Sequence, residues 1–315
     1  MKSSSNPLLT ADDVGAEAWE DWILFAPKVI LDGSTYKMWY AAGTGTTTAD
    51  NDYQIGYATS SDGITWTRDT GNNPVLAPGG GVTWDADSVL ESHVIKDGST
   101  YKMWYQGART STGKSQIGYA TSSDGITWTK DGGNPVVANG AGGSDDEDQA
   151  SKPCVLKIGA SDYRMWYCGK PSGGDFVVMY ATSTDGIAWT KDSTTLTVSG
   201  EFCVYPYVIN EDSVFKMIVQ VGPNGGAYNL LEYISADGST NWQLQGEYLT
   251  RGSNPAFDDF YLGGGHSIID TGNGREIFYA GRDQATQEPT LTRRYNKIGQ
   301  ALRVEDVSSV SFDIV

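Results

Sequence analysis

Carboxylate side chains gather at four places along this sequence, each shortly before an apolar stretch. The clusters are Glu20 and Asp21, Asp85 and Asp87, Asp145 to Asp148, and Asp258 and Asp259. Aromatic residues stand nearby, among them Trp19, Trp22, Trp84 and Tyr261. Paired carboxylates cleave glycosidic bonds, and aromatic rings offer an apolar face with which a sugar can be held. These clusters, named here the acidic collar, therefore favour sugar chemistry.

Three collar residues are candidate catalytic carboxylates: Asp21, Asp87 and Asp148. Three aromatic residues that border the same segments are candidate sugar-binding groups: Trp22, Tyr205 and Tyr207. Two other interpretations stay open. The carboxylates can be solvated turn residues, or the run from Asp145 to Asp148 can hold a calcium ion. No other cofactor is expected.

The elements that must position these groups come from an internal repeat. DGSTYKMWY occurs at 32–40 and again at 97–105, and QIGYATSSDGITWT occurs at 54–67 and at 116–129. Looser copies follow at 161–167, 179–190, 232–242 and 266–283. Each unit predicts four strands joined by tight turns that contain Asp and Gly.

Five such units predict one all-β domain over residues 1–315, a five-bladed β-propeller with four antiparallel strands in each blade. The expected blades cover roughly 16–77, 82–138, 145–198, 200–250 and 257–315. Asn-Pro-apolar segments follow two of the blades, and a further copy stands at 6–9. We expect residues 6–9 to complete the last blade and close the ring, which would remove exposed sheet edges.

The turn SxDGxxW occurs three times and resembles the Asp-box of sialidase propellers, shortened by one residue. We expect Asp62, Asp124 and Asp185 to cap these turns. The tryptophans at 66, 128 and 189 are expected to pack between blades.

The repeated pattern KMWY, IGYATSSDGITW and NPVL resembles the propeller glycosidases of families 43, 32 and 130. The resemblance covers essentially the whole chain and is specific for the fold rather than for one substrate. It implies a glycan or oligosaccharide as partner. It also implies catalytic carboxylates at the start of each innermost strand, in the residue before a proline.

The residues in that position, named here the proline column, are Ala26, Glu91, Lys152, Tyr205 and Gly264. Only Glu91 is a carboxylate, and it resembles the acid of the EDPR motif in mannoside-processing propellers, with serine in place of the proline. Lys152 resembles a lysine in the next blade of that family.

Two more residues carry the resemblance. His266, in GGGHSII, resembles the histidine of the GHNS segment of arabinanases, which lies at the channel and helps to hold a central ion or water. Arg282, in FYAGRDQA, lies in a segment that resembles the YYGAAD strand of families 32 and 130. Both are candidate substrate-binding residues.

The catalytic set departs from the family pattern. The third-blade glutamate of family 32 falls on Ser151, and the first-blade aspartate of family 43 falls on Ala26. Two functions therefore stay open. One is a carbohydrate-recognising binding or structural module of a cell surface or viral particle, with weak or no hydrolysis. The other is an active glycoside hydrolase or phosphorylase that uses Glu91 and a collar aspartate.

Composition limits the partners. The chain has 39 acidic against 22 basic residues and a formal charge of −17, so it repels nucleic acid and anionic membranes. The sequence has no signal-peptide pattern and no apolar run of membrane length. We expect a soluble protein, extracellular or particle-associated rather than cytoplasmic, with no membrane insertion.

Overall fold

The computed structural model describes residues 7–11, 18–44, 52–223, 228–249, 261–271, 274–282 and 297–303. Within these ranges the chain is all-β, as the repeat predicts, and its helices are two single 3-10 turns, η1 (Ala18–Glu20) and η2 (Thr110–Thr112). No helix in these ranges is long and apolar enough to cross a membrane.

The strands form antiparallel sheets in which neighbours along the chain are neighbours in space. The first sheet contains β1 (Ile23–Asp32), β2 (Thr35–Gly43), β3 (Gln54–Ser60) and β4 (Thr67–Arg68). The second contains β5 (Ser88–Asp97), β6 (Thr100–Arg109), β7 (Lys114–Ser122) and β8 (Thr129–Lys130). The third contains β9 (Gln149–Gly159), β10 (Asp162–Lys170), β11 (Val177–Ser183) and β12 (Thr190–Leu196), and a single bridge joins it to β7.

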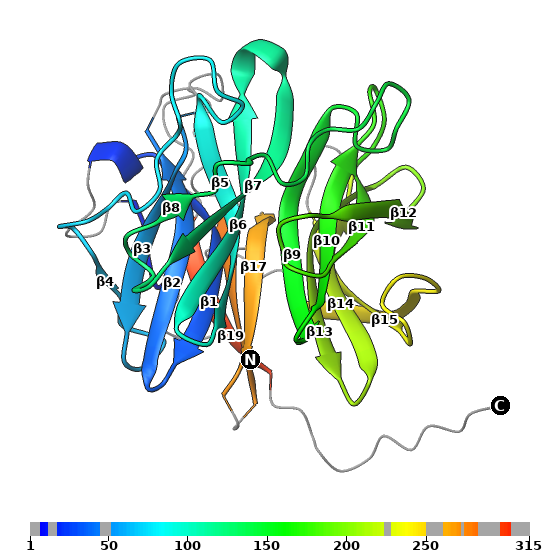
Figure 1. Cartoon of the computed structure of the whole chain (residues 1–315). Coiled ribbons are helices and arrows are strands. Elements are labelled where there is room, and N and C mark those ends of the chain that lie inside the picture. Colours follow the sequence, from blue (N-terminus) through cyan, green and yellow to red (C-terminus); the bar gives the residue numbers. More distant parts are fainter. Residues whose placement is uncertain are drawn as a thin grey trace, which may run out of the picture.

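Two more sheets complete the described structure. One contains β13 (Phe202–Glu211), β14 (Val214–Gly222), β15 (Asn229–Ser235) and β16 (Gln243–Leu249). The other contains β17 (Tyr261–Asp270), β18 (Arg275–Arg282) and β19 (Lys297–Arg303). The first strands of the sheets contact one another in the order β1, β5, β9, β13, β17 and again β1. Figure 1 shows the sheets standing side by side around these inner strands, the arrangement of a β-propeller.

Each second strand is buried on both faces because another sheet covers each side. Trp39, Trp104 and Trp166 are fully buried, and the Nε1 of each donates to a glycine carbonyl in a turn of the following sheet, at 2.7–2.8 Å. An indole N–H inside a core needs such an acceptor. The repeated MWY motif therefore packs one sheet and also fastens it to the next.

The SxDGxxW turns have the capping role expected from the sequence. Asp62 Oδ1 accepts hydrogen bonds from the backbone N–H groups of Ile64 and Thr65, at 2.8 and 2.7 Å. These donors, Thr65 first, hold the pKa of the exposed Asp62 at about 2. The Trp128 ring contacts Trp39 of the preceding sheet edge to face, with centroids 6.1 Å apart, so its predicted position between blades is confirmed.

The segment at residues 7–11 lies beside the last sheet. Leu9 forms an antiparallel bridge with Ile298 of β19, and Leu8 N–H donates to the Ile298 carbonyl at 2.7 Å. Leu9 is 2% exposed, and Arg68 Nη2 donates to the carbonyl of Thr10 at 2.6 Å. The segment thus contacts both the last sheet and the first.

Candidate functional site

Each innermost strand carries an irregularity at the proline column. The pairing register shifts there in β1, β5, β9, β13 and β17. The column residues all have positive φ: 49° at Ala26, 53° at Glu91, 53° at Lys152, 56° at Tyr205 and 80° at Gly264. A positive φ costs a non-glycine residue about 1–3 kcal/mol, and such strain gathers at functional sites. The column is therefore a repeated device that redirects side chains, as a β-bulge does.

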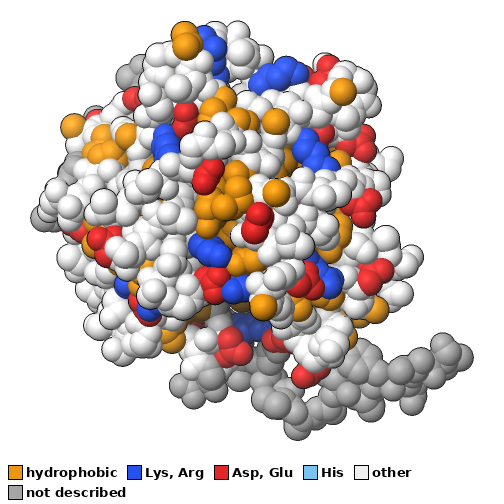
Figure 2. All heavy atoms as spheres, in the orientation of Figure 1, with side chains coloured by type: hydrophobic (Ala, Val, Ile, Leu, Met, Phe, Trp, Pro, Cys, Tyr) orange, Lys and Arg blue, Asp and Glu red, His pale blue; other side chains and the backbone are white. Residues whose placement is uncertain are grey.

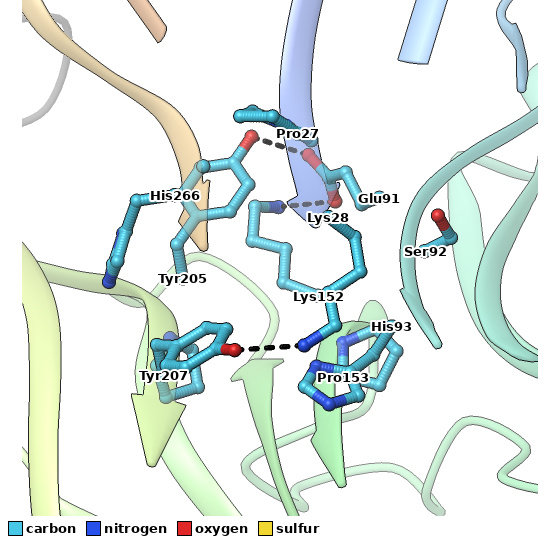
Figure 3. Close-up of a pocket in the computed structure, with 13 residues that line it drawn as sticks. Pro27, Lys28, Glu91, Ser92, His93, Lys152, Pro153, Tyr205, Tyr207 and His266 are labelled. Atoms are coloured by element: carbon cyan, nitrogen blue, oxygen red, sulfur yellow. Dashed lines mark hydrogen bonds and ion pairs between the residues drawn. The ribbon is translucent and has the colours of Figure 1, made fainter. Parts of the chain in front are cut away.

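The bulged segments together line one pocket with about 360 Å³ of space, part of it open to solvent. Every innermost strand contributes to its wall (Figure 3). The lining residues are Ala26, Pro27, Lys28, Glu91, Ser92, His93, Lys152, Pro153, Tyr205, Pro206, Tyr207, Gly265 and His266. Gly265 is needed for close approach, because a Cβ there would lie 2.6 Å from the Cα of Ala26.

Glu91, Lys152 and Tyr205 form one connected group in the pocket (Figure 3). Tyr205 Oη donates to Glu91 Oε1 at 2.5 Å, and Lys152 Nζ lies 3.4 Å from Glu91 Oε2. The Lys152 ammonium also lies 4.8 Å from the Phe176 ring centroid and 5.2 Å from that of Tyr205. Glu91 is 6% exposed, so its charge is matched by a cation and a hydroxyl rather than by bulk water.

A second connected group consists of residues that stand two positions after the proline column in their own strands. Lys28 Nζ donates to Tyr207 Oη at 2.9 Å, and Tyr207 Oη donates to the carbonyl of Ile268 at 2.8 Å. The rings of His93 and His266 lie on either side of Tyr207, with centroids 5.8 and 5.9 Å from it. His266 Nε2 is 3.2 Å from the Ile218 carbonyl, whereas its buried Nδ1 has no hydrogen-bond partner in the described ranges.

Burial keeps both histidines neutral. It lowers the pKa of His266 to about 4, against the opposing effect of the Ile218 carbonyl. It lowers the pKa of His93 well below its ordinary 6.5, and the nearby Lys28 charge acts in the same direction. Both rings are therefore uncharged hydrogen-bonding groups at neutral pH.

These histidines predict a loss of stability on mild acidification. Between pH 6.5 and about 4 the unfolded chain binds protons at these sites and the folded chain does not, so the free energy of unfolding falls as the pH falls. The His266 contribution approaches about 3 kcal/mol at the lower limit. Urea unfolding at pH 7, 5.5 and 4.5 measures it, and His266→Gln should flatten the pH dependence. A slope unchanged by that substitution would contradict this prediction.

Three collar carboxylates are structural. Glu20, Asp85 and Asp146 are 0%, 3% and 2% exposed. Each pairs with a cation at the start of its sheet's fourth strand: Arg68 Nε at 2.9 Å, Lys130 Nζ at 2.6 Å and Lys191 Nζ at 2.6 Å. Each also accepts a hydrogen bond from a buried tyrosine, respectively Tyr40, Tyr105 and Tyr167. These three carboxylates therefore tie the fourth strand to the second strand in the first three sheets.

The predicted catalytic aspartates do not line the pocket in the described structure. Asp21 is exposed. Asp87 Oδ2 accepts the backbone N–H of Thr110 at 2.6 Å, and Asp148 Oδ1 lies 3.6 Å from Lys114 Nζ. Asp258 and Asp259 lie outside the described residues. Figure 2 shows acidic side chains beside basic ones over one face of the molecule, in keeping with this pairing.

Four of the predicted substrate-binding residues line the pocket, and Trp22 does not. The four are Lys152, Tyr205, Tyr207 and His266. Trp22 is 4% exposed and packs in an apolar cluster against which Tyr205 also lies, outside the pocket wall. The side chain of Arg282 lies outside the described residues.

Sequence reasoning did not single out Lys28, Ser92 and His93, which line the same pocket. The spacing in the sequence does indicate two of these residues, Lys28 and His93. Tyr207 and His266 stand two residues after the column, and Lys28 and His93 occupy the same offset in their own strands.

No group of three or more metal-binding side chains occurs among the described residues. The side chains in the run from Asp145 to Asp148 contact different residues of the same chain. Asp145 accepts a hydrogen bond from the Thr194 hydroxyl, Asp146 forms an ion pair with Lys191, and Glu147 accepts a hydrogen bond from the Gly143 N–H.

Comparison with known families agrees with this geometry. The family model described as the glycosyl hydrolases family 32 N-terminal domain matches residues 27–205, more than half of the chain. The chain belongs to this family. The match begins at the proline of the first bulge and ends at Tyr205, so it covers three of the five column positions: Glu91, Lys152 and Tyr205.

Two curated relatives of this chain come from Mycobacterium tuberculosis. Uncharacterized protein MT1551 (strain CDC 1551 / Oshkosh) and uncharacterized protein Rv1502 (strain ATCC 25618 / H37Rv) are each 32% identical to this chain over 170 residues. The matched region is 52% of this chain and 53% of each relative, so the chain spans about half the length of these proteins.

Several solved structures share the fold of this chain. An N-acetylgalactosamine deacetylase from F. plautii, in complex with blood group B trisaccharide, has a TM-score of 0.70 at 14% identity, covering 96% of this chain and 95% of that one. A thermostable family-43 glycoside hydrolase has a TM-score of 0.65 at 13% identity, covering 90% of each. A GH130-family structure has a TM-score of 0.65 at 15% identity, covering 98% and 94%. These likenesses show the fold.

Proposed function

We propose that this protein binds carbohydrate in the Glu91 pocket and hydrolyses it weakly or not at all. It serves as a binding or structural module of glycosidase-like ancestry. The family match and the pocket at the bulged strands support a sugar as the ligand.

One observation carries the choice of binding over catalysis. Among the described residues, Glu91 is the only carboxylate that lines the pocket. Hydrolysis of a glycosidic bond needs two carboxyl groups, about 5–5.5 Å apart for retention and about 6.5–9.5 Å apart for inversion. The candidate partners Asp21, Asp87 and Asp148 stand elsewhere, two of them held by Thr110 and Lys114. A lone carboxylate can accept hydrogen bonds from sugar hydroxyls without cleaving the bond.

The architecture that holds the pocket is part of the proposal. The chain forms one domain, 1–315, of five four-stranded blades, closed into a ring by the N-terminal segment. The bridge between Leu9 and Ile298 supports this closure, as does the close approach of Gly265 to Ala26. A closed ring explains why every inner strand reaches one pocket.

A glycan array with the wild-type protein, Glu91→Gln and Asp148→Asn tests the proposal. Glu91→Gln should change the affinity for the bound glycan by about tenfold or more, because a hydrogen bond to a charged group contributes about 1.5–3 kcal/mol. Asp148→Asn is the matched control, because its carboxylate is outside the pocket, and it should leave binding unchanged. Absence of glycan binding, or equal binding by the Glu91→Gln protein, would overturn the proposal.

A further inference from the structure

The ammonium group of Lys28 is buried without a carboxylate partner. The residue is 5% exposed; within the part of the chain that the structure describes, its Nζ has one hydrogen bond, to Tyr207 Oη at 2.9 Å, and lies 4.7 Å from the centroid of that ring. Among the described residues, none of the ion pairs involves Lys28. An ammonium has three N–H donors, and burying its charge is costly unless an anion or several acceptors compensate it. Two donors of Lys28 are left for a ligand.

The carboxylate in the pocket does not supply this compensation. Glu91 is already engaged by Tyr205 at 2.5 Å and by Lys152 at 3.4 Å. The pocket lining thus has two lysines against one glutamate, and the two histidines are neutral at pH 7. A wall with excess positive charge lies inside a protein whose formal charge is −17.

Two further polar atoms of the lining have no partner among the residues that the structure describes. Ser92 Oγ and His266 Nδ1 are both buried and make no hydrogen bond there. His266 is 7% exposed, and it reaches the pocket from β17, whereas Lys28 comes from β1 and Ser92 from β5 (Figure 3). Buried polar atoms without partners are rare in native proteins and mark places where a ligand or water completes the bonding.

We propose that the pocket selects an acidic sugar, a uronic acid residue, whose carboxylate binds the Lys28 ammonium, with Ser92 and His266 as uncharged hydrogen-bonding neighbours. This inference rests on the proposed function and names its substrate class. A lysine without a counter-ion gains most from a ligand that brings the negative charge with it, since the charge is then matched in a site of low dielectric. Glu91 and Tyr205 remain available to the hydroxyl groups of the same sugar.

Calorimetric titration tests the proposal with four probes: methyl β-D-glucuronide, methyl α-D-galacturonide, and the corresponding neutral methyl glucoside and galactoside. At least one uronide should bind about tenfold or more tightly than its neutral counterpart. Lys28→Met should remove this preference, so that each uronide and its neutral counterpart bind with affinities within about twofold of each other. Lys114→Met is the control, because this lysine pairs with Asp148 away from the pocket.

The wild-type titrations decide the outcome even if Lys28→Met does not fold. Equal affinity for uronides and neutral glycosides would overturn the acidic-sugar assignment and leave carbohydrate binding intact. Binding of neither class, together with an empty glycan array, would remove the proposed function as well. A parallel titration with inorganic phosphate separates a free anion from a sugar carboxylate. Phosphate binding that depends on Lys28, without uronide binding, would also overturn the assignment.

Discussion

Asp146→Ala is expected to lower the free energy of unfolding by about 2–3 kcal/mol, because it removes a buried carboxylate that binds both the Lys191 ammonium, whose side chain is 30% exposed, and a buried hydroxyl group. Asp146 is 2% exposed, and it binds Lys191 Nζ at 2.6 Å and the hydroxyl of Tyr167 at 3.0 Å. The substitution would leave a buried tyrosine hydroxyl without its acceptor as well. Urea denaturation at pH 7 measures the change.

Asp148→Ala is the matched control for this prediction. The two aspartates stand two positions apart in one acidic run, but the Asp148 side chain is 31% exposed and its ion pair with Lys114 spans 3.6 Å. Exposed ion pairs contribute about 0–1 kcal/mol. Equal destabilisation by the two substitutions would contradict the assignment of Asp146 to the structure.

Deletion of residues 1–10 is expected to have the second large effect. It removes the Leu9 side chain, which is 2% exposed and lies in a cluster with Leu24, Phe278 and Ile298. Loss of a buried leucine side chain costs about 2–5 kcal/mol, and the deletion also exposes the edge of β19. We expect a lower melting temperature and a tendency to aggregate, measured by calorimetry and light scattering.

Leu244→Ala controls for the loss of an apolar group as such, because Leu244 is 56% exposed and its removal should leave the melting temperature nearly unchanged. If the protein without residues 1–10 melts and remains in solution as the full chain does, the closure of the ring by this segment is wrong.

The sheets were predictable because their sequence signals are local and repeated. Apolar residues on both faces of the MWY strands predict burial between sheets, and the serine and aspartate of SxDGxxW hydrogen-bond within the same few residues. The repeat also aligns Glu91, Lys152 and Tyr205 in the proline column, and the structure brings these three residues into contact.

The collar was harder to interpret because its partners are distant in the sequence. Asp85 and Asp146 each pair with a lysine 45 residues later, and burial of a carboxylate depends on that partner. Lys28 was missed for a related reason. A lysine within a strand ordinarily faces solvent, and the signal that Lys28 lies in the pocket wall is the bulge at Ala26, where φ is 49°, which only the structure shows.

The central claim is that the pocket binds sugar and hydrolyses it weakly or not at all. The most direct test measures the rate at which 4-nitrophenol is released from a panel of aryl glycosides and aryl glucuronides. The wild-type protein and the Glu91→Gln variant are compared, each with and without phosphate. We expect little or no turnover above the rate of the buffer for either protein, because the described pocket holds one carboxylate where hydrolysis needs two. Robust turnover that disappears in Glu91→Gln would contradict the account and identify the protein as an active glycosidase or phosphorylase.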